Sequence, residues 1–421
     1  MNAWRIVCAG GWFKAPHDTI NYRMTDHSPR PKAPVYLDNQ ATTRCDPRVV
    51  QAMLPWFTEQ YGNPASADHV MGRIADAAVE TARANIAALL GAGPREIVFT
   101  SGATESNNIA IKGAARHALR HGDNRRRIVT VVTEHKCVLE SVADLKDEGF
   151  DPILLPVGAD GLLDPDVLRK ALGVPTLLVS VMAVNNEIGV VQEIAKLAAI
   201  AKDAGALFHT DIAQAVGKIP LDLTGWKVDL ASVSGHKIYG PKGIGALFVR
   251  RHPRARVMPL FSGGGQERGV RSGTLAAPLI VGLGEACRIA AEEMEAEATR
   301  IGFLRGRLLD ELRAHIPGIS VNGALGHRIA GNLNITFPVE TAARMLARMP
   351  DLCVSTGSAC TSADVEPSYV LRAIGLSDEE AARTLRIGIG RFTSPADIDY
   401  AASALSLAHR GKHAADHLAG A

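Results

Sequence analysis

The sequence lacks a disulfide framework, a membrane-length apolar run and an excess of charge of either sign. Its six cysteines are spread over 421 residues with no CxxC pair, which excludes a disulfide scaffold and favours reduced thiols in a cytoplasmic enzyme. No apolar run approaches the roughly 20 residues that span a bilayer. The N-terminal segment RIVCAGGWF is too short and too mixed for a secretory signal. With a net charge of +2, neither nucleic acid nor a membrane surface is an expected partner.

The composition is that of a globular protein, and the chain is long enough for two domains. Hydrophobic residues make up 47% and charged residues 21% of the chain, which allows a sizeable core. We expect an N-terminal extension over residues 1–34, which has no apolar period and contains Met24 as an ordinary start. A large domain is expected over 46–294, and a smaller α+β domain over 35–45 together with 295–421.

Short apolar strands alternate with helical patterns through the first two thirds of the chain. An Asp46-Pro47 start signal opens the first helix. Strands that are apolar throughout are typical of a parallel sheet covered on both faces. The pattern therefore predicts an α/β fold with a mostly parallel sheet. The predicted strands are 96–100, 127–132, 176–183, 206–211 and 229–234, and further helices are predicted at 67–90, 193–204 and 279–315.

Polar residues gather where these strands end, which is where parallel sheets bind ligands. The strand at 96–100 runs into SGATES and a helix. Gly102 allows a tight turn there, and Thr104 with its neighbours offers N–H and hydroxyl donors at a helix N-terminus, as in a phosphate site. An ordinary capping box with Thr104 as the cap is the alternative interpretation.

Two further strands end in residues that suit a pyridoxal-phosphate site. Asp211 ends one of them, where a carboxylate can keep a pyridine nitrogen protonated, and Gln214 lies one turn further on; a capping aspartate is the alternative. Lys237 follows the next strand in SVSGHKIYGPKG and suits a Schiff-base lysine, because a partly desolvated amine stays nucleophilic. Ser234 and His236 could add phosphate donors.

Further side chains are candidate site residues or alternatives to one. Lys242 competes with Lys237, but its Pro-Lys-Gly turn favours a side chain that faces solvent. His135 follows the strand at 127–132, where an imidazole can stack on a cofactor and shuttle protons. Cys360 lies among small residues in VSTGSACTSADVEPS, which suits an exposed, nucleophilic thiol. Arg386 could hold a carboxylate with two hydrogen bonds, with Arg391 as a second candidate and a structural salt bridge as the alternative.

Long motifs in a fixed order then make a family recognisable. From about residue 35 to about 409 the sequence resembles cysteine desulfurases of the NifS/IscS-like group, within the class V, fold-type I pyridoxal-phosphate enzymes. The motifs are YLDNQATT, YGNPAS, TSGATESNN, TEHK, VNNEIG, SGHKIYGPKGIGAL, GGGQERGVRSGT and GSACTSADVEPSYVLRAIG. The resemblance implies a large domain with a mostly parallel, seven-stranded type of sheet and a smaller α+β domain that carries the catalytic cysteine loop.

The resemblance also implies a role for each candidate residue and a reaction. L-cysteine would become L-alanine and its sulfur a persulfide, for iron–sulfur cluster assembly, tRNA thiolation or both. The implied partners are a second copy in a homodimer and a sulfur acceptor or iron–sulfur scaffold protein, and no metal is implied. Lys237 would hold pyridoxal 5'-phosphate covalently, Asp211 would pair with its ring nitrogen, Gln214 with its ring hydroxyl, and His135 would stack on the ring. Ala103, Thr104, Ser234 and His236 would bind the phosphate end, and Thr274 would reach it from the other subunit. Asn186 would lie near both the substrate and the ring oxygen of the cofactor, Arg386 would bind the substrate carboxylate, and Cys360 would accept sulfur.

Three departures and three competing functions accompany this resemblance. The extension before residue 35 has no counterpart, Ala183 replaces a histidine of close relatives, and the C-terminal tail GKHAADHLAGA is short. A class V aminotransferase would need no loop thiol, so the GSACTS segment counts against it. Selenocysteine lyase activity stays open, because the same site handles selenium. A non-catalytic scaffold would not need Lys237, Asp211, His135 and Cys360 together.

Overall fold

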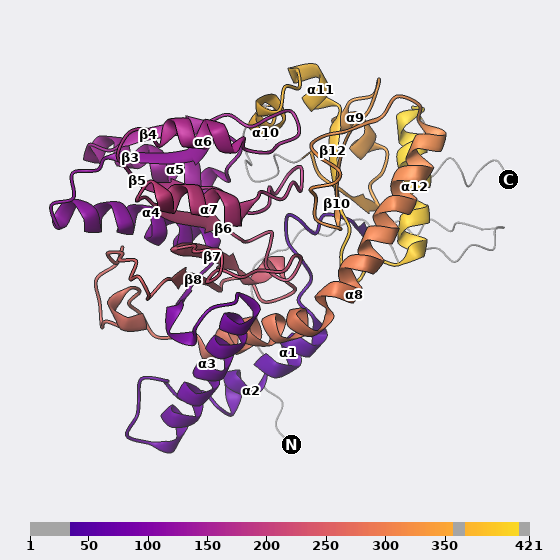
Figure 1. The fold of residues 1–421 in the computed structure, drawn as a ribbon. Coiled ribbons are helices and arrows are strands. Elements are labelled where there is room, and N and C mark those ends of the chain that lie inside the picture. Colours follow the sequence, from indigo (N-terminus) through magenta and orange to yellow (C-terminus); the bar gives the residue numbers. More distant parts are fainter. Residues whose placement is uncertain (1–33, 357–366, 412–421) are drawn as a thin grey trace, which may run out of the picture.

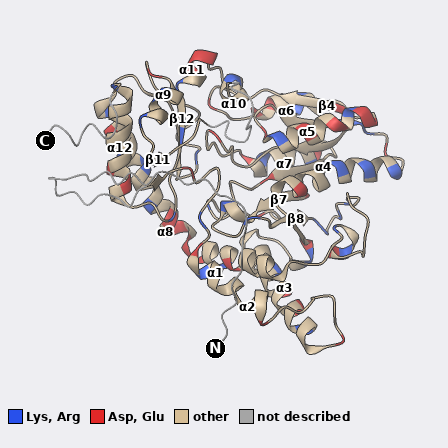
Figure 2. Ribbon diagram, turned by 180° about the vertical axis from the view of Figure 1, so that it is seen from behind, with Lys and Arg blue, Asp and Glu red and all other residues tan. Residues whose placement is uncertain are grey.

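The computed structural model describes residues 34–356 and 367–411. The expected extension, apart from its last residue, lies outside the described residues, as does Cys360. Within the described ranges, no helix is both long and apolar enough to cross a membrane. Positive and negative side chains are interspersed over the ribbon (Figure 2), in keeping with the nearly balanced charge of the sequence.

The centre of the large part is a seven-stranded sheet in the order β2-β8-β7-β6-β5-β3-β4. The strands β4, β3, β5, β6 and β7 pair in parallel, and β8 is antiparallel to both β7 and β2. The prediction of a mostly parallel sheet is therefore confirmed. The strand bounds are β2 Ile97–Thr100, β3 Arg127–Val131, β4 Asp151–Leu155, β5 Thr176–Ser180, β6 Leu207–Asp211, β7 Leu230–Ser234 and β8 Gly245–Val249.

Helices cover both faces of this sheet because its strands are apolar on both sides. On β3, Val129 joins the cluster built with α3, α6, α7 and α8, whereas the neighbouring Ile128 joins the cluster with α4 and α5. Asp46 caps α1 through Arg48 N, and a proline follows at the first helical position, as predicted. The helix bounds are α1 Pro47–Met53, α2 Pro55–Thr58, α3 Val70–Leu89, α4 Ala103–Arg120, α5 Lys136–Asp144, α6 Pro165–Ala171 and α7 Ile194–Asp203.

The C-terminal part has its own sheet and apolar core. Its antiparallel sheet has the order β12-β10-β9, and the first strand of the described chain, β1, pairs in parallel with β11. Val35 and Leu37 belong to this second core, together with apolar residues between 301 and 408. The bounds are β1 Val35–Tyr36, β9 Ser320–Val321, β10 Asn332–Thr336, β11 Leu352–Cys353, β12 Thr384–Gly388, α9 Ala342–Ala347, α10 Tyr369–Ala373, α11 Asp378–Ala382 and α12 Pro395–His409.

One long helix, α8 (Ala277–His315), joins the two parts. Figure 1 shows it extending from beside α1 and α3 to α12. Its first half contributes apolar residues from Ala277 to Ile289 to the core of the large part, and its second half contributes residues from Ile301 to Leu312 to the second core. The division of the chain at residue 295 remains a proposal, and it falls between these two groups.

Candidate active site

A cavity of about 480 Å³ lies at the carboxyl ends of β5, β6 and β7. Residues from the segment 40–42, from the turn after β2 and from β12 complete its wall. The structure thus brings to one place side chains that are up to 346 residues apart in the sequence, Gln40 and Arg386 being the extremes. The predicted site residues that line it are Ala103, Thr104, His135, Asn186, Asp211, Gln214, Ser234, His236, Lys237 and Arg386.

The turn between β2 and α4 forms one end of the cavity. Gly102 is the N-cap of α4, with a φ of 154° that favours glycine, and Thr104 lies inside the first turn. The alternative interpretation of Thr104 as the cap is therefore wrong. Glu105 accepts a hydrogen bond from Ser101 N at 2.6 Å and pairs with Arg271 at 2.9 Å. Because Arg271 offsets the carboxylate, an anion can still bind at this helix N-terminus.

His236 and Ser234 lie beside that turn. His236 Nδ1 is 3.0 Å from the Thr42 hydroxyl, and Ser234 is buried at the end of β7. Burial lowers the pKa of His236 to about 4, with a second contribution from the neighbouring Lys237. The imidazole is therefore neutral at neutral pH, when it can donate one hydrogen bond to an anion without carrying a charge.

Asp211 and Gln214 lie at the end of β6 with their polar atoms already oriented. Asp211 Oδ1 accepts from Ala213 N at 2.9 Å, and Oδ2 accepts from Asn107 Nδ2 at 2.7 Å. The first bond closes a turn, and no helix begins in the fully described stretch between β6 and β7, so the alternative interpretation of Asp211 as a helix cap is wrong. Gln214 Nε2 donates to Gln40 O at 2.8 Å, and its Oε1 accepts from Lys218 Nζ at 2.7 Å. Burial, with Lys237 nearby, lowers the pKa of Lys218 to about 7. Asp211 thus both orders its turn and lines the cavity.

Lys237 is half-buried and anchored by main-chain oxygens of the segment 40–41. Its Nζ donates to Gln40 O at 2.6 Å and to Ala41 O at 2.7 Å. Lys242 also lines the cavity but is exposed, in agreement with the expectation from its turn. The structure therefore favours Lys237 over Lys242 as the partly desolvated amine.

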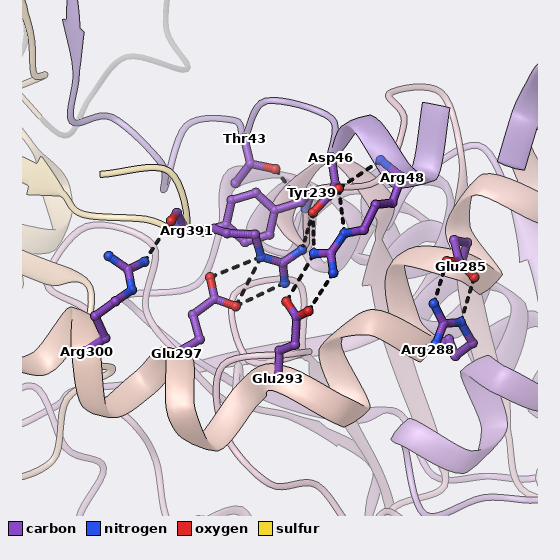
Figure 3. A network of polar contacts seen from close by, with 10 residues as sticks. All are labelled: Thr43, Asp46, Arg48, Tyr239, Glu285, Arg288, Glu293, Glu297, Arg300 and Arg391. Carbon is purple, nitrogen blue, oxygen red and sulfur yellow. Dashed lines mark hydrogen bonds and ion pairs between the residues drawn. The ribbon is translucent and has the colours of Figure 1, made fainter. Parts of the chain in front are cut away.

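A polar network behind the Lys237 turn holds it in place (Figure 3). Tyr239 has a φ of 62°, a conformation that side-chain-bearing residues rarely adopt. Tyr239 N donates to the Thr43 hydroxyl at 2.9 Å, and Asp46 N donates to Tyr239 O at 2.9 Å. The Arg391 guanidinium lies 4.3 Å above the Tyr239 ring and pairs with Asp46 at 2.9 Å and Glu297 at 3.0 Å. These contacts fix the unusual backbone that follows Lys237.

Arg391→Ala is expected to lower the free energy of unfolding by about 3 kcal/mol, because it leaves the nearly buried Glu297 carboxylate without its ion-pair partner. The matched control on α8 is Arg307→Ala, whose partner Asp399 is half exposed and whose loss should cost less than about 1 kcal/mol. Urea unfolding at pH 7 measures both. Equal losses in the two variants would show that the network adds nothing beyond a surface pair.

The same network makes the free energy of unfolding depend on pH. Hydrogen bonds from Arg48 hold the pKa of Asp46 below its usual range, against the opposing effect of burial. A carboxylate whose pKa is depressed in the folded state contributes stability above its unfolded pKa of about 4, and this contribution is lost as the pH falls below that value.

Arg386 and not Arg391 reaches the cavity. Arg386 is buried on β12 and lines the cavity, whereas Arg391 is held by the carboxylates of the network and does not line it. The Arg386 guanidinium already donates to Asp38 Oδ1 at 2.7 Å and to Asn186 O at 3.1 Å. A substrate carboxylate would therefore share this guanidinium with Asp38, a contact between segments too far apart in the chain to be predicted from spacing.

His135 caps α5 and contacts a thiol. Its Nδ1 accepts from Cys137 N at 3.3 Å and lies 3.0 Å from Cys137 Sγ. Two buried carboxyl groups lie nearby: Glu134 accepts from Met182 N at 2.5 Å, and Glu187 from the Ser368 hydroxyl at 2.5 Å. Burial raises the pKa of both, that of Glu134 well above its usual range.

One predicted residue lines a different hollow, one lies outside the described residues, and other residues of the site were not predicted. Thr274 lines a separate hollow of about 210 Å³ that also contains Arg83 and Glu267. Cys360 lies outside the described residues. Sequence reasoning missed Cys137, Asn107 and the oxygens of segment 40–41, although the motifs TEHK, TSGATESNN and YLDNQATT run through or end beside them.

The cavity fits pyridoxal 5'-phosphate in its donor set and its unsatisfied groups. Asn186 Oδ1 is buried in the wall and has no hydrogen-bond partner among the described residues, so it can accept from a ring hydroxyl. A helix N-terminus faces one end, a carboxylate lies at the end of β6, and an amine follows β7. These are the groups that a phosphate, a pyridine nitrogen and an aldehyde would require.

Comparisons with known proteins agree with this geometry. The aminotransferase class-V family matches residues 35–401. The chain is 54% identical over 372 residues to a mitochondrial cysteine desulfurase of Arthroderma benhamiae, over 88% of this chain and 74% of that protein. It is 52% identical over 368 residues to cysteine desulfurase IscS of Rickettsia bellii, over 87% and 89%. A solved structure of a NifS-like protein has a TM-score of 0.81 and 36% identity, over 88% of this chain and 98% of that one.

Proposed function

The chain belongs to the class-V aminotransferase family and, within it, to the cysteine desulfurases, and from this premise we propose that it is a pyridoxal-phosphate-dependent sulfurtransferase. It converts L-cysteine to L-alanine and transfers the sulfur to Cys360. The observation that carries the proposal is the meeting of Lys237, Asp211 and the α4 N-terminus in one cavity. An aminotransferase of the same family would share this cavity but would have no use for a nucleophilic thiol.

Each part of the cofactor has a counterpart in the cavity wall. When bound, pyridoxal phosphate supplies an electron sink for the electrons released from the substrate Cα–H bond. The residues that would hold it are Ala103, Thr104, Ser234 and His236 at the phosphate, Asp211 at the ring nitrogen, Asn186 and Gln214 at the ring hydroxyl, His135 on the ring face and Lys237 at the aldehyde.

The side chains of the protein then have separate tasks. Arg386 orients the substrate by its carboxylate. The Lys237 amine removes the Cα proton and later returns a proton to the product. The Cys360 thiolate attacks the substrate sulfur, so that a sulfur–sulfur bond forms while the carbon–sulfur bond breaks. The electron pair of the broken bond stays with the three-carbon fragment, which is protonated and leaves as L-alanine.

Purified protein loaded with the cofactor and given L-cysteine and a thiol reductant should release alanine and sulfide in equal amounts. Borohydride before substrate should fix the cofactor on one lysine, and peptide mapping should find it on Lys237. Alanine without sulfide would point to a different reaction. An adduct on Lys242 would overturn the assignment of the lysine.

Arg386→Lys is expected to raise the KM for L-cysteine at least about tenfold, because an ammonium cannot form two parallel hydrogen bonds to a carboxylate. The change should appear in KM more than in kcat. The control is Arg383→Lys, just before the same strand, whose guanidinium donates to Pro338 O away from the cavity. Steady-state kinetics measure KM for both variants. Equal KM values would show that Arg386 does not bind the substrate carboxylate.

Partners and location follow from the same proposal. Thr274 would complete the phosphate site of a second copy in a homodimer, in keeping with its place outside this chain's own cavity. The persulfide would pass to an acceptor such as an iron–sulfur scaffold protein. Four cysteines in the described part are free thiols, as expected in a reducing compartment such as the cytoplasm.

A further inference from the structure

A chain of hydrogen bonds links Asp211 to His135 through two residues that the proposed reaction does not use. Asn107 is fully buried between them. Its Nδ2 lies 2.7 Å from Asp211 Oδ2 and 3.1 Å from Cys137 Sγ. Cys137 Sγ in turn lies 3.0 Å from His135 Nδ1. Both ends of the chain, Asp211 and His135, line the cavity.

The direction of each hydrogen bond in this chain can be worked out from its ends. The Asp211 carboxylate oxygen accepts, which places the Asn107 amide nitrogen toward it. The same nitrogen has a second hydrogen, which points to Cys137 Sγ. The sulfur therefore accepts from Asn107, and its own S–H is left to donate to His135 Nδ1.

A second donor leads to the same conclusion by an independent route. The backbone N–H of Cys137 points to His135 Nδ1 at 3.3 Å. A backbone N–H can only donate, so a hydrogen on Nδ1 would oppose it. Nδ1 is therefore an acceptor from both the main chain and the thiol of Cys137.

We propose that Asn107 and Cys137 are positioning residues that fix His135 as a neutral imidazole with its proton on Nε2. The ring then offers a hydrogen-bond donor at Nε2 and no lone pair there. This role rests on the proposed reaction. In that reaction His135 acts as a hydrogen-bond donor, and Lys237 removes the Cα proton. A neutral ring also avoids placing a cation against a protonated pyridine ring.

The charges around His135 are compatible with this state. Glu134 and Glu187 are buried beside it, and burial favours the protonated form of both. The charged side chains of the cavity wall include the Asp211 carboxylate and the Lys237 and Arg386 cations, and Arg386 also acts on Glu187. With two neighbouring carboxyl groups biased toward neutrality, the local field does little to draw a second proton onto the ring.

The test is nitrogen NMR of the cofactor-loaded protein with 15N-labelled histidine rings, with His135 assigned by the signal lost in His135→Gln. At pH 7 the wild-type His135 signals should show an unprotonated Nδ1 and a protonated Nε2. The reverse pattern, or two protonated nitrogens, overturns the proposal. The measurement is independent of turnover: alanine formation with the reverse pattern refutes only this inference, and the expected pattern without alanine formation refutes only the proposed function.

Variants at Cys137 separate positioning from simple packing. Cys137→Ser keeps a donor and an acceptor and should keep the pKa of His135. Cys137→Ala removes the bond that stabilises the neutral ring and should raise that pKa by roughly 0.5 to 1. Cys353→Ala, a half-buried thiol outside the cavity, is the control and should change nothing. Equal pKa values in Cys137→Ala and the wild type would show that the thiol does not position the ring.

Discussion

Cys360→Ala is expected to bind the cofactor and L-cysteine as the wild type does, yet to lose sulfide release on the order of a thousandfold or more. The thiol is needed only after the Cα proton has been removed, when it attacks the substrate sulfur. Cys360 lies outside the described residues, so the prediction rests on the small residues that flank it and on the GSACTS motif. Sulfide assays with and without reductant, together with a persulfide-specific label, measure the loss.

The matched control is Cys353→Ala, which removes a thiol seven residues earlier in the chain. This variant should form persulfide at the wild-type rate. The cofactor absorbance should still respond to L-cysteine in both variants, because neither change alters the cavity wall described above. Near-normal sulfide release by Cys360→Ala without added reductant would mean that another group takes the sulfur.

The central sheet was largely predictable because its strands carry their own signal. Each predicted strand is present within about one residue, except that the strand predicted at 176–183 ends earlier, at Ser180. The two missed strands are β4 and β8. Strand β4 lies at the sheet edge, with side chains that are mostly half-buried or exposed. Its apolar run is only three residues long and is flanked by Pro152 and Pro156, and proline is tolerated on an edge strand. Strand β8 begins inside the motif SGHKIYGPKGIGAL, whose glycines and proline favour a turn and hide the start of a strand.

The candidate site was predictable in its residue types but not in its contacts. A strand end can be located from local pattern, and the polar residues at neighbouring parallel strand ends must meet. The contacts that orient them come from distant segments: Asp38 on Arg386, Gln40 on Lys237 and Arg391 on Tyr239. No periodicity links such pairs, so their meeting follows only from the packing of the two parts around α8.

The position of Lys237 explains why its loss is expected to be the most damaging change in the cavity wall. Its Nζ lies between two main-chain oxygens, in a turn held by Tyr239 and the network behind it. An amine on such a fixed backbone can bond covalently to the cofactor and then act on the substrate Cα proton. Lys218 is also half-buried and its pKa is lowered to about 7, but it donates to Gln214 Oε1 and does not line the cavity, so it offers no substitute.

Lys237→Ala is therefore expected to lower alanine formation from L-cysteine on the order of 10³ to 10⁴-fold and to abolish covalent attachment of the cofactor. The control is Lys242→Ala, which removes the other amine of the cavity wall but leaves the anchored turn intact. After borohydride treatment the cofactor should stay on the denatured control protein, because it is covalently bound there. Denaturation of Lys237→Ala treated in the same way should release the cofactor. Because the two lysines share the cavity and differ in burial and anchoring, a loss of attachment in Lys242→Ala with retention in Lys237→Ala would show that exposure, and not desolvation, selects the reactive amine.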